Sequence, residues 1–175
     1  MKTLIASLLC LLLCYLPCIA GSTTTLPATV DYESLITTKL GKGKKAELKA
    51  RMSITKFATK FVGKKYRYGA LGPNQFDCSG YTKFIFQHYD INLGRSSGEQ
   101  SKKGRVKRIS QLKKADLVFF GTKRKVQHVG IVVEASKGRL MVAHCSSSRG
   151  VIIENVLKSS YWKERILFGK DVINN

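Results

Sequence analysis

The sequence predicts an α+β domain, because helical patterns come first along the chain and strand patterns follow them. Residues 46–61 and 78–89 each carry apolar side chains at the i, i+3, i+4 and i+7 positions that form one face of a helix. A polar, basic connector over residues 92–114 follows. Five short segments rich in β-branched and aromatic residues then indicate an antiparallel sheet: 116–120, 128–134, 140–145, 151–156 and 165–169.

The second predicted helix begins after Asp77, a residue type suited to capping the first turn. Gly80, inside that turn, would let another backbone or a substrate come close. Residues 66–75, just before the helix, contain two glycines, a proline and an asparagine, and are predicted to be a loop. The predicted helix face consists of Tyr81, Phe84, Ile85 and His88.

The N-terminus has the pattern of a secretory signal peptide over residues 1–20. Lys2 precedes a short apolar run, and Ala20 offers a small-residue cleavage site with no basic stop-transfer cluster after it. We therefore expect an exported protein of the periplasm or cell envelope, with no membrane span once the leader is removed. A rival interpretation makes Cys18 a lipid-carrying first residue, although Pro17 directly before it fits that pattern poorly.

The rest of the chain is long enough for one domain with a proper core. Residues 21–45 are rich in Ser, Thr, Gly and Lys without a sustained apolar period, so they predict a basic flexible linker. The folded domain is expected over residues 46–171, with 172–175 as a C-terminal tail.

The formal net charge is +20, from 31 basic and 11 acidic residues, which favours an anionic partner. Nucleic acid is disfavoured by the export signal and by the lack of zinc-finger or helix-turn-helix spacing. Anionic polymers of the envelope are the expected partners, and a solvated basic face without a specific ligand is the alternative. The densest basic runs are 102–108 and 123–125.

Cys78 is a candidate nucleophile because it lies in the first turn of a predicted helix. The positive end of the helix, helped by an imidazolium, can lower a thiol pKa from about 8.5 into the range of roughly 3.5 to 7.5. The alternative is a small buried apolar residue. If the leader is removed, Cys145 is the other cysteine of the chain, and a bond between the two would abolish thiol chemistry.

Three histidines are candidate bases for this thiol. His88 lies ten residues after Cys78 on the same helix, roughly 15 Å along its axis, and is excluded as the base. We expect it at a helix end or core edge. His128 and His144 lie on two strands that the chain joins through a predicted three-residue loop with Gly138 in the left-handed conformation.

The register of this predicted hairpin determines which side chains share a face. It sets Ala135 opposite Arg139 and Gly130 opposite His144, so His128 and His144 become diagonal neighbours. Cys145 then points to the other face, away from the thiol of Cys78, and is expected in the core.

A thiol, an imidazole to move its proton and a third group to orient that imidazole are the requirements of cysteine catalysis. Cys78, His128 and His144 could supply them. The alternatives for the two histidines are a satisfied polar pair or a metal site, but no further ligands with zinc-site spacing accompany them. We therefore expect no metal and no cofactor.

Six motifs in order resemble the NlpC/P60-type cell-wall cysteine peptidases, which are papain-like in fold. They are 66–70 (YRYGA), 76–80 (FDCSG), 95–97 (RSS) with Gln100, 116–120 (DLVFF), 128–131 (HVGI) and His144. The resemblance implies N-terminal helices packed on a mainly antiparallel sheet of five to six strands. The chain departs from the family pattern at Ala70, at Tyr68 and at Lys114-Ala115, where Pro-Gly is usual.

The resemblance also implies a function. Cys78 would be the nucleophile, His128 the base and His144 the orienting third member. The substrate would be a peptidoglycan stem peptide, cut between D-glutamate and the next diamino acid. An amidase or acyltransferase on the same scaffold is one alternative, and a non-catalytic basic wall-binding protein is another. The residues implied to contact the substrate or its oxyanion are Tyr66, Asp77, Ser79, Arg95 and Ser96.

Overall fold

The structure is a computed structural model that describes residues 41–174. The predicted signal peptide, Cys18 and most of the predicted linker lie outside the described residues. The first helix of the described residues begins at Lys42 rather than at Ala46, so the last residues of the predicted linker are helical.

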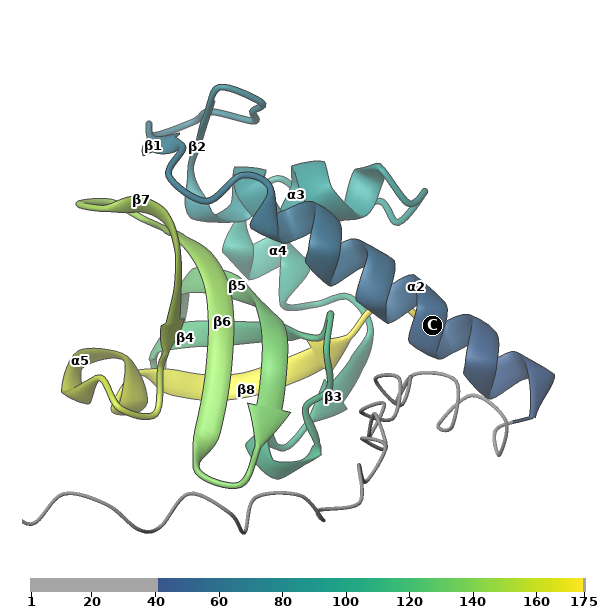
Figure 1. The fold of residues 1–175 in the computed structure, drawn as a ribbon. Helices are drawn as coiled ribbons and strands as arrows, with labels where there is room; N and C mark the ends of the chain where they lie inside the picture. Colours follow the sequence, from purple (N-terminus) through teal and green to yellow (C-terminus); the bar gives the residue numbers. More distant parts are fainter. Residues whose placement is uncertain (1–40, 175) are drawn as a thin grey trace, which may run out of the picture. The chain divides into compact units, whose positions relative to one another are not determined.

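Helices precede the main sheet, which confirms the predicted α+β class (Figure 1). The polar connector contains two short helices and a strand, and a small parallel pair, β1 and β2, joins the two ends of the predicted loop before the second helix. The elements are α2 (Lys42–Thr59), β1 (Lys65–Tyr66), β2 (Gln75–Phe76), α3 (Cys78–Gln87), α4 (Ser97–Gln100), β3 (Arg105–Lys107), η1 (Ile109–Gln111), β4 (Leu117–Thr122), β5 (Lys125–Ser136), β6 (Arg139–Ser146), β7 (Gly150–Asn155), α5 (Ser160–Lys163) and β8 (Ile166–Asp171).

The main sheet has six strands in the order β3-β8-β4-β5-β6-β7, and every pair in it is antiparallel. All five predicted strands are present. The sixth, β3, is a three-residue edge strand whose Val106 is 68% exposed, and its sequence shows no buried face that a pattern could reveal.

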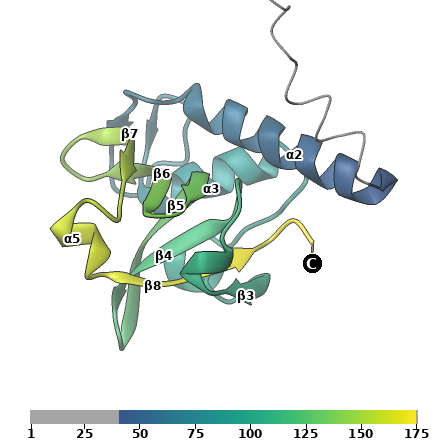
Figure 2. The ribbon, with the colours of Figure 1, turned by 60° about the horizontal axis from the view of Figure 1, so that its bottom comes forward.

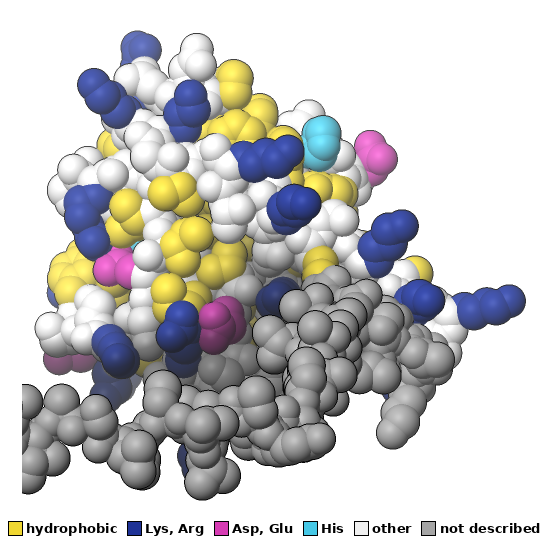
Figure 3. All heavy atoms as spheres, in the orientation of Figure 1, with side chains coloured by type: hydrophobic (Ala, Val, Ile, Leu, Met, Phe, Trp, Pro, Cys, Tyr) yellow, Lys and Arg dark blue, Asp and Glu magenta, His cyan; other side chains and the backbone are white. Residues whose placement is uncertain are grey.

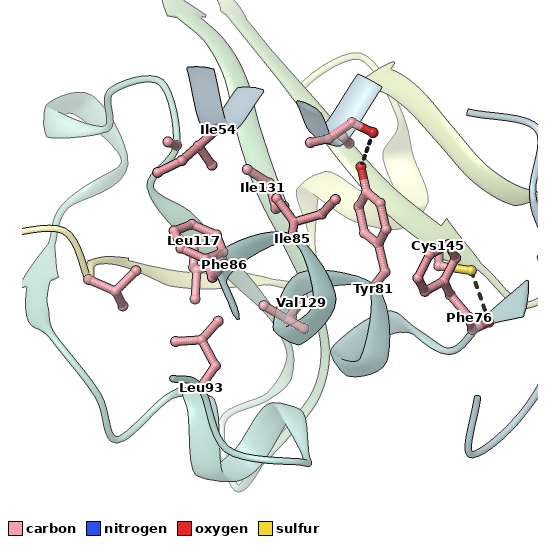
Figure 4. Close-up of a cluster of buried hydrophobic side chains, with 14 of the residues drawn as sticks. Ile54, Phe76, Tyr81, Ile85, Phe86, Leu93, Leu117, Val129, Ile131 and Cys145 are labelled. Carbon is pink, nitrogen blue, oxygen red and sulfur yellow. Dashed lines mark hydrogen bonds between the residues drawn. The ribbon is translucent and has the colours of Figure 1, made fainter. Parts of the chain in front are cut away.

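Helices α2 and α3 cover one face of the sheet in both ribbon views (Figures 1 and 2). The core between these helices and the sheet is drawn in Figure 4, where Ile85 and Phe86 of α3 lie beside Val129 and Ile131 of β5. Burial of each such side chain contributes roughly 1.5–3 kcal/mol. The opposite face of the sheet carries a second cluster of buried side chains: Leu112, Val118, Phe120, Val132, Leu140, Val142 and Val156.

The β5–β6 hairpin corrects the predicted loop but keeps the predicted register at the histidines. Ser136 pairs with Arg139, so the loop has two residues rather than three. A bulge between Val132 and Glu134 then adds one residue to β5 and restores the expected pairing from Ile131 onward. Gly138 has a φ of +73°, as expected for this turn.

Arg51 fixes α2 to the sheet through a buried charged cluster. The residue is 2% exposed, and its guanidinium contacts three carboxylates from different parts of the chain. Nε lies 2.7 Å from Glu47, Nη1 lies 2.7 Å from Asp116, and Nη2 lies 2.8 Å from Asp171. The cluster joins α2, the start of β4 and the end of β8.

Candidate active site

Cys78 occupies the first turn of α3, as predicted, because Asp77 caps that turn. The Asp77 carboxylate accepts hydrogen bonds from the Gly80 backbone N–H at 2.6 Å and from the Ser79 hydroxyl at 3.1 Å. Gly80 packs against the backbone of the preceding loop: a Cβ there would lie 2.1 Å from the Ala70 carbonyl oxygen. Glycine at this position thus lets the loop close over the helix start.

The start of α3 opens onto a cleft of about 590 Å³. Cys78 and His128 both line it, and Tyr66 is the one predicted substrate contact among its lining residues. The other walls come from β4, β5, the end of β6, the β6–β7 turn, and α5 with the residues beside it: Phe120, Gly121, Gln127, Cys145, Ser146, Ser147, Ser148, Arg149, Ser159, Tyr161, Trp162 and Arg165.

His128 and His144 meet side by side, as the hairpin register predicts. Nε2 of His128 lies 3.0 Å from Nδ1 of His144, and the two ring centroids are 5.0 Å apart. His144 is fully buried behind His128. The third histidine, His88, lies at the exposed end of α3 and stacks on Phe57, which confirms its exclusion from the site.

Glu154 of β7 contacts the other side of His144, and the sequence analysis missed it. Its Oε1 lies 2.9 Å from Nε2 of His144. The strand register could have found it, because Glu154 pairs with Val142 and therefore shares the face of β6 that carries His144. Within residues 41–174, no group of three or more His, Cys, Asp or Glu side chains could hold a metal ion.

Trp162 of α5 was also missed, and it forms a wall beside the histidines. Its indole ring stacks on His128 with a centroid distance of 4.7 Å and an interplanar angle of 25°. The same ring meets His144 edge-on at 4.9 Å. Nothing in the local sequence around Trp162 indicates this position, because α5 reaches the site only through the fold.

The ionisation state of Cys78 differs from the reactive thiolate that the sequence predicts. Burial, and then the negative charge of Asp77, raise the pKa of Cys78, although backbone N–H groups of Ser79, Val129 and Cys78 act in the opposite direction. Burial, together with the neighbouring His144, lowers the pKa of His128 to about 3. The expectation of a lowered thiol pKa is therefore wrong, because desolvation outweighs the helix terminus.

Four of the predicted substrate contacts lie outside the cleft lining and bind one another or the backbone. Arg95 donates to both carboxylate oxygens of Asp77 and to the Ser79 hydroxyl. Burial opposes ionisation of Asp77, but Arg95 and the Gly80 N–H hold its pKa below the usual value. Ser96 caps α4. Their contact with substrate stays a prediction.

Cys145 is a core residue, as predicted, and both it and Cys78 are free thiols. Its expected direction is wrong, because α3 packs on the sheet face that carries Cys145. The Cys145 thiol donates to the Phe76 carbonyl oxygen at 3.2 Å, and burial raises its pKa to about 12 (Figure 4).

Comparisons with known proteins agree with this architecture. Residues 63–170 match the NlpC/P60 family model. The chain is 40% identical over 113 residues to a Listeria monocytogenes protein named "Probable endopeptidase p60", covering 65% of this chain and 22% of that protein. It is 31% identical to the Escherichia coli protein named "Murein DD-endopeptidase MepS/Murein LD-carboxypeptidase", covering 84% of this chain and 72% of that protein.

A solved structure gives the same answer for the fold. The crystal structure of the NlpC/p60 domain of peptidoglycan hydrolase SagA matches with a TM-score of 0.59 and 27% identity, covering 69% of this chain and 97% of that one. The fold and the site define a papain-like domain in which a cysteine and a histidine line one cleft and a second histidine contacts the first. The chain belongs to the NlpC/P60 family.

Proposed function

We propose that this protein is a cysteine endopeptidase that hydrolyses peptidoglycan stem peptides, at the bond between D-glutamate and the following diamino acid. The observation that carries the proposal is the geometry: Cys78 and His128 line one cleft, and His144 lies 3.0 Å behind His128. The names of the relatives support the substrate class, since they include an endopeptidase, a murein endopeptidase and a peptidoglycan hydrolase.

Each residue has a defined role in the proposed reaction. Because Nε2 of His128 is engaged by His144, Nδ1 is the nitrogen left to take the Cys78 proton. The thiolate then attacks the substrate carbonyl carbon, and backbone N–H groups at the start of α3 stabilise the oxyanion. The imidazolium of His128 gives its proton to the leaving amine as the C–N bond breaks. A thioester between Cys78 and the acyl group remains.

Water completes the cycle. His128 takes a proton from the water that attacks the thioester carbonyl, and the resulting tetrahedral intermediate collapses with release of the carboxylic acid and return of the proton to Cys78. The pKa directions of the two groups imply that the free enzyme holds a neutral thiol beside a neutral imidazole. Proton transfer then accompanies substrate binding or attack rather than preceding it.

Defined muropeptides test the proposal. The purified protein and its Cys78→Ala variant are incubated with each peptide, and the products are identified by mass spectrometry. We expect cleavage by the wild type alone, with the mass of one water added across the D-glutamyl bond. Transfer of the acyl group to an added amine would identify an acyltransferase. Binding without any cleavage would identify a non-catalytic wall-binding protein and contradict the proposed function.

We further propose that the protein is exported and acts in the envelope. Among residues 41–174, none of the helices has the length and apolar character needed to cross a membrane. The mass of the mature protein tests the two N-terminal hypotheses: cleavage after Ala20 without a lipid indicates a released or wall-bound enzyme, whereas a diacylglyceryl mass on Cys18 indicates a lipoprotein.

We also propose that the basic surface holds the protein on anionic wall polymers. Lys and Arg side chains are spread over the face in Figure 3, among uncharged side chains and few acidic ones. Such a distribution predicts weak, salt-sensitive binding rather than one specific site. Sedimentation with purified sacculi should decline between low and high salt, and equal sedimentation at both would exclude charge as the tether.

A further inference from the structure

One carboxylate oxygen in the site accepts hydrogen bonds from three donors. Oε1 of Glu154 lies 2.9 Å from Nε2 of His144, 2.9 Å from the indole nitrogen of Trp162 and 2.7 Å from the guanidinium of Arg149. The donors come from β6, α5 and the turn before β7. A carboxylate is an acceptor only, so each of these contacts constrains which partner atom carries a proton.

The contact with Glu154 determines the tautomer of His144. Because ionised Glu154 can only accept, Nε2 of neutral His144 carries the hydrogen and Nδ1 is bare. Bare Nδ1 must in turn accept from Nε2–H of His128. Neutral His128 then has its lone pair on Nδ1, the one nitrogen not engaged by His144. That is the tautomer in which His128 can take the thiol proton.

We propose that Glu154 is a fourth member of the site, a positioning residue that acts through His144 to hold His128 in the base-competent tautomer. This inference deepens the proposed function and rests on it. The negative charge of Glu154 also favours the imidazolium that forms on His128 during attack, because that charge increases the acceptor strength of His144 Nδ1. Glu154 itself needs no contact with substrate.

The surroundings of Glu154 keep its carboxylate in place. The indole of Trp162 donates to the carboxylate and stacks on His128 with the same ring, which couples the two positions. Arg149 supplies a positive charge from the rim of the cleft. The groups that face the His144 ring are therefore His128 from β5, Glu154 from β7 and Trp162 from α5, with the Arg149 charge nearby.

The isosteric variant Glu154→Gln tests this role, with Glu134→Gln as the matched control. Glu134 lies on β5, pairs with the exposed Arg139 and is absent from the cleft lining. We expect kcat/KM for muropeptide cleavage to fall about 10- to 100-fold in Glu154→Gln, the range expected for loss of a hydrogen bond to a charged group, with KM little changed. Glu134→Gln should match the wild type.

Two measurements separate positioning from a merely structural role, and neither needs a substrate. The first is the rate of Cys78 alkylation by iodoacetamide against pH. In Glu154→Gln the rate at neutral pH should fall, because His128 in the other tautomer cannot take the thiol proton as the sulfur attacks the iodoacetamide. The second is the ¹⁵N chemical shifts of the histidine rings, which distinguish protonated from bare nitrogens.

In the wild type we expect Nε2–H on both His144 and His128 at neutral pH, and a mixture of tautomers in Glu154→Gln. A wild-type His144 with the hydrogen on Nδ1 would overturn the inference, even if the variant could not be folded. Unchanged alkylation and kcat/KM in a folded Glu154→Gln would overturn it as well. If the wild type alkylates as expected but cleaves no muropeptide, the proposed function fails while the tautomer assignment is still decided by the ring nitrogens.

Discussion

The buried cluster around Arg51 and the chain from His128 to Glu154 are both polar networks, but they lie in different surroundings. Arg51 is 2% exposed and meets three carboxylates, so its charge is compensated on every side. The histidine network ends at a cleft, where His128 has a ring nitrogen not engaged by His144 and Cys78 is partly exposed. The Arg51 network is enclosed and holds elements together, whereas the histidine network leaves one ring nitrogen open for a proton.

The difference predicts that the two networks fail in different ways. Substitution at the cleft should remove activity and leave the fold, because Cys78 is partly exposed on the cleft and anchors no other element. Substitution at Arg51 should lower the stability of the fold and leave the chemistry of the folded fraction intact, because an uncompensated buried carboxylate is costly while the cleft is untouched.

The largest expected effect belongs to Cys78→Ala. Loss of the nucleophile should lower kcat/KM for muropeptide cleavage by about 10⁴-fold or more, equivalent to roughly 5.5 kcal/mol of transition-state stabilisation. The free energy of unfolding should change by no more than about 1 kcal/mol, because the substitution removes one sulfur atom at the cleft. Steady-state cleavage assays and urea denaturation measure the two quantities. A large loss of stability would mean that Cys78 is a packing residue as well.

The next effect is that of Arg51→Leu. Removing the guanidinium leaves buried Asp116 without its ion-pair partner and buried Asp171 with only the longer contacts to Arg105 and Lys107, so unfolding free energy should fall by about 3–5 kcal/mol. Cleavage by the folded fraction at low temperature should be unchanged. The matched control is Arg139→Leu, whose exposed pair with Glu134 should contribute less than about 1 kcal/mol. Equal losses in both variants would contradict the buried cluster as the anchor of α2.

An intermediate effect concerns acid. The pKa of His128 is about 3 in the folded protein, against an ordinary value of 6.5. Between these values the unfolded chain binds a proton that the folded protein does not, so stability should fall as pH falls below 6.5. The contribution of His128 should reach up to about 2 kcal/mol by pH 5, a range above that in which Asp77 titrates.

Urea denaturation at a series of pH values measures this loss, and His128→Gln is the informative variant. It removes the titrating ring, so its stability should decline less steeply between pH 6.5 and pH 5 than that of the wild type. Parallel declines in the two proteins would show that His128 is protonated in the folded state and that the cleft is wetter than its burial indicates.

The sequence predicts the strands, the start of α3 and the pairing of His128 with His144, because alternation, capping and register are local properties. The register came out right although the predicted loop was one residue too long, since the bulge before Glu134 compensates for it. A bulge has no strong sequence signature, so the register at the histidines was predicted correctly partly because the shorter loop and the bulge offset each other. The edge strand β3 escaped prediction because it has little buried surface.

The parts of the site that the sequence did not reveal are those that depend on long-range packing. The raised pKa of Cys78 follows from its burial in the folded protein and from the charge of Asp77, and the position of Cys78 on the helix does not determine that burial. Trp162 reaches His128 because α5 folds back over the end of the sheet. Strand alternation could have indicated Glu154, but no chemistry was expected of a single carboxylate two strands away from His128.

The smallest expected effect tests the backbone beside the Arg51 cluster. Ala115 precedes Asp116, is fully buried and has a φ of +62°, a conformation that costs an L-residue roughly 1–2 kcal/mol. Ala115→Gly relieves that strain but loses a buried methyl group, worth about 0.8 kcal/mol, and adds unfolded-state freedom, worth about 0.5–1 kcal/mol.

These opposing contributions should leave the unfolding free energy of Ala115→Gly within about 1 kcal/mol of the wild type. Ala115→Val should lose considerably more, because a β-branched side chain is strained at positive φ and its extra methyl groups have no room in the packed core. Urea denaturation of both variants distinguishes the contributions. A large loss in Ala115→Gly would show that the Ala115 methyl, rather than the Arg51 cluster alone, holds the start of β4 against α2.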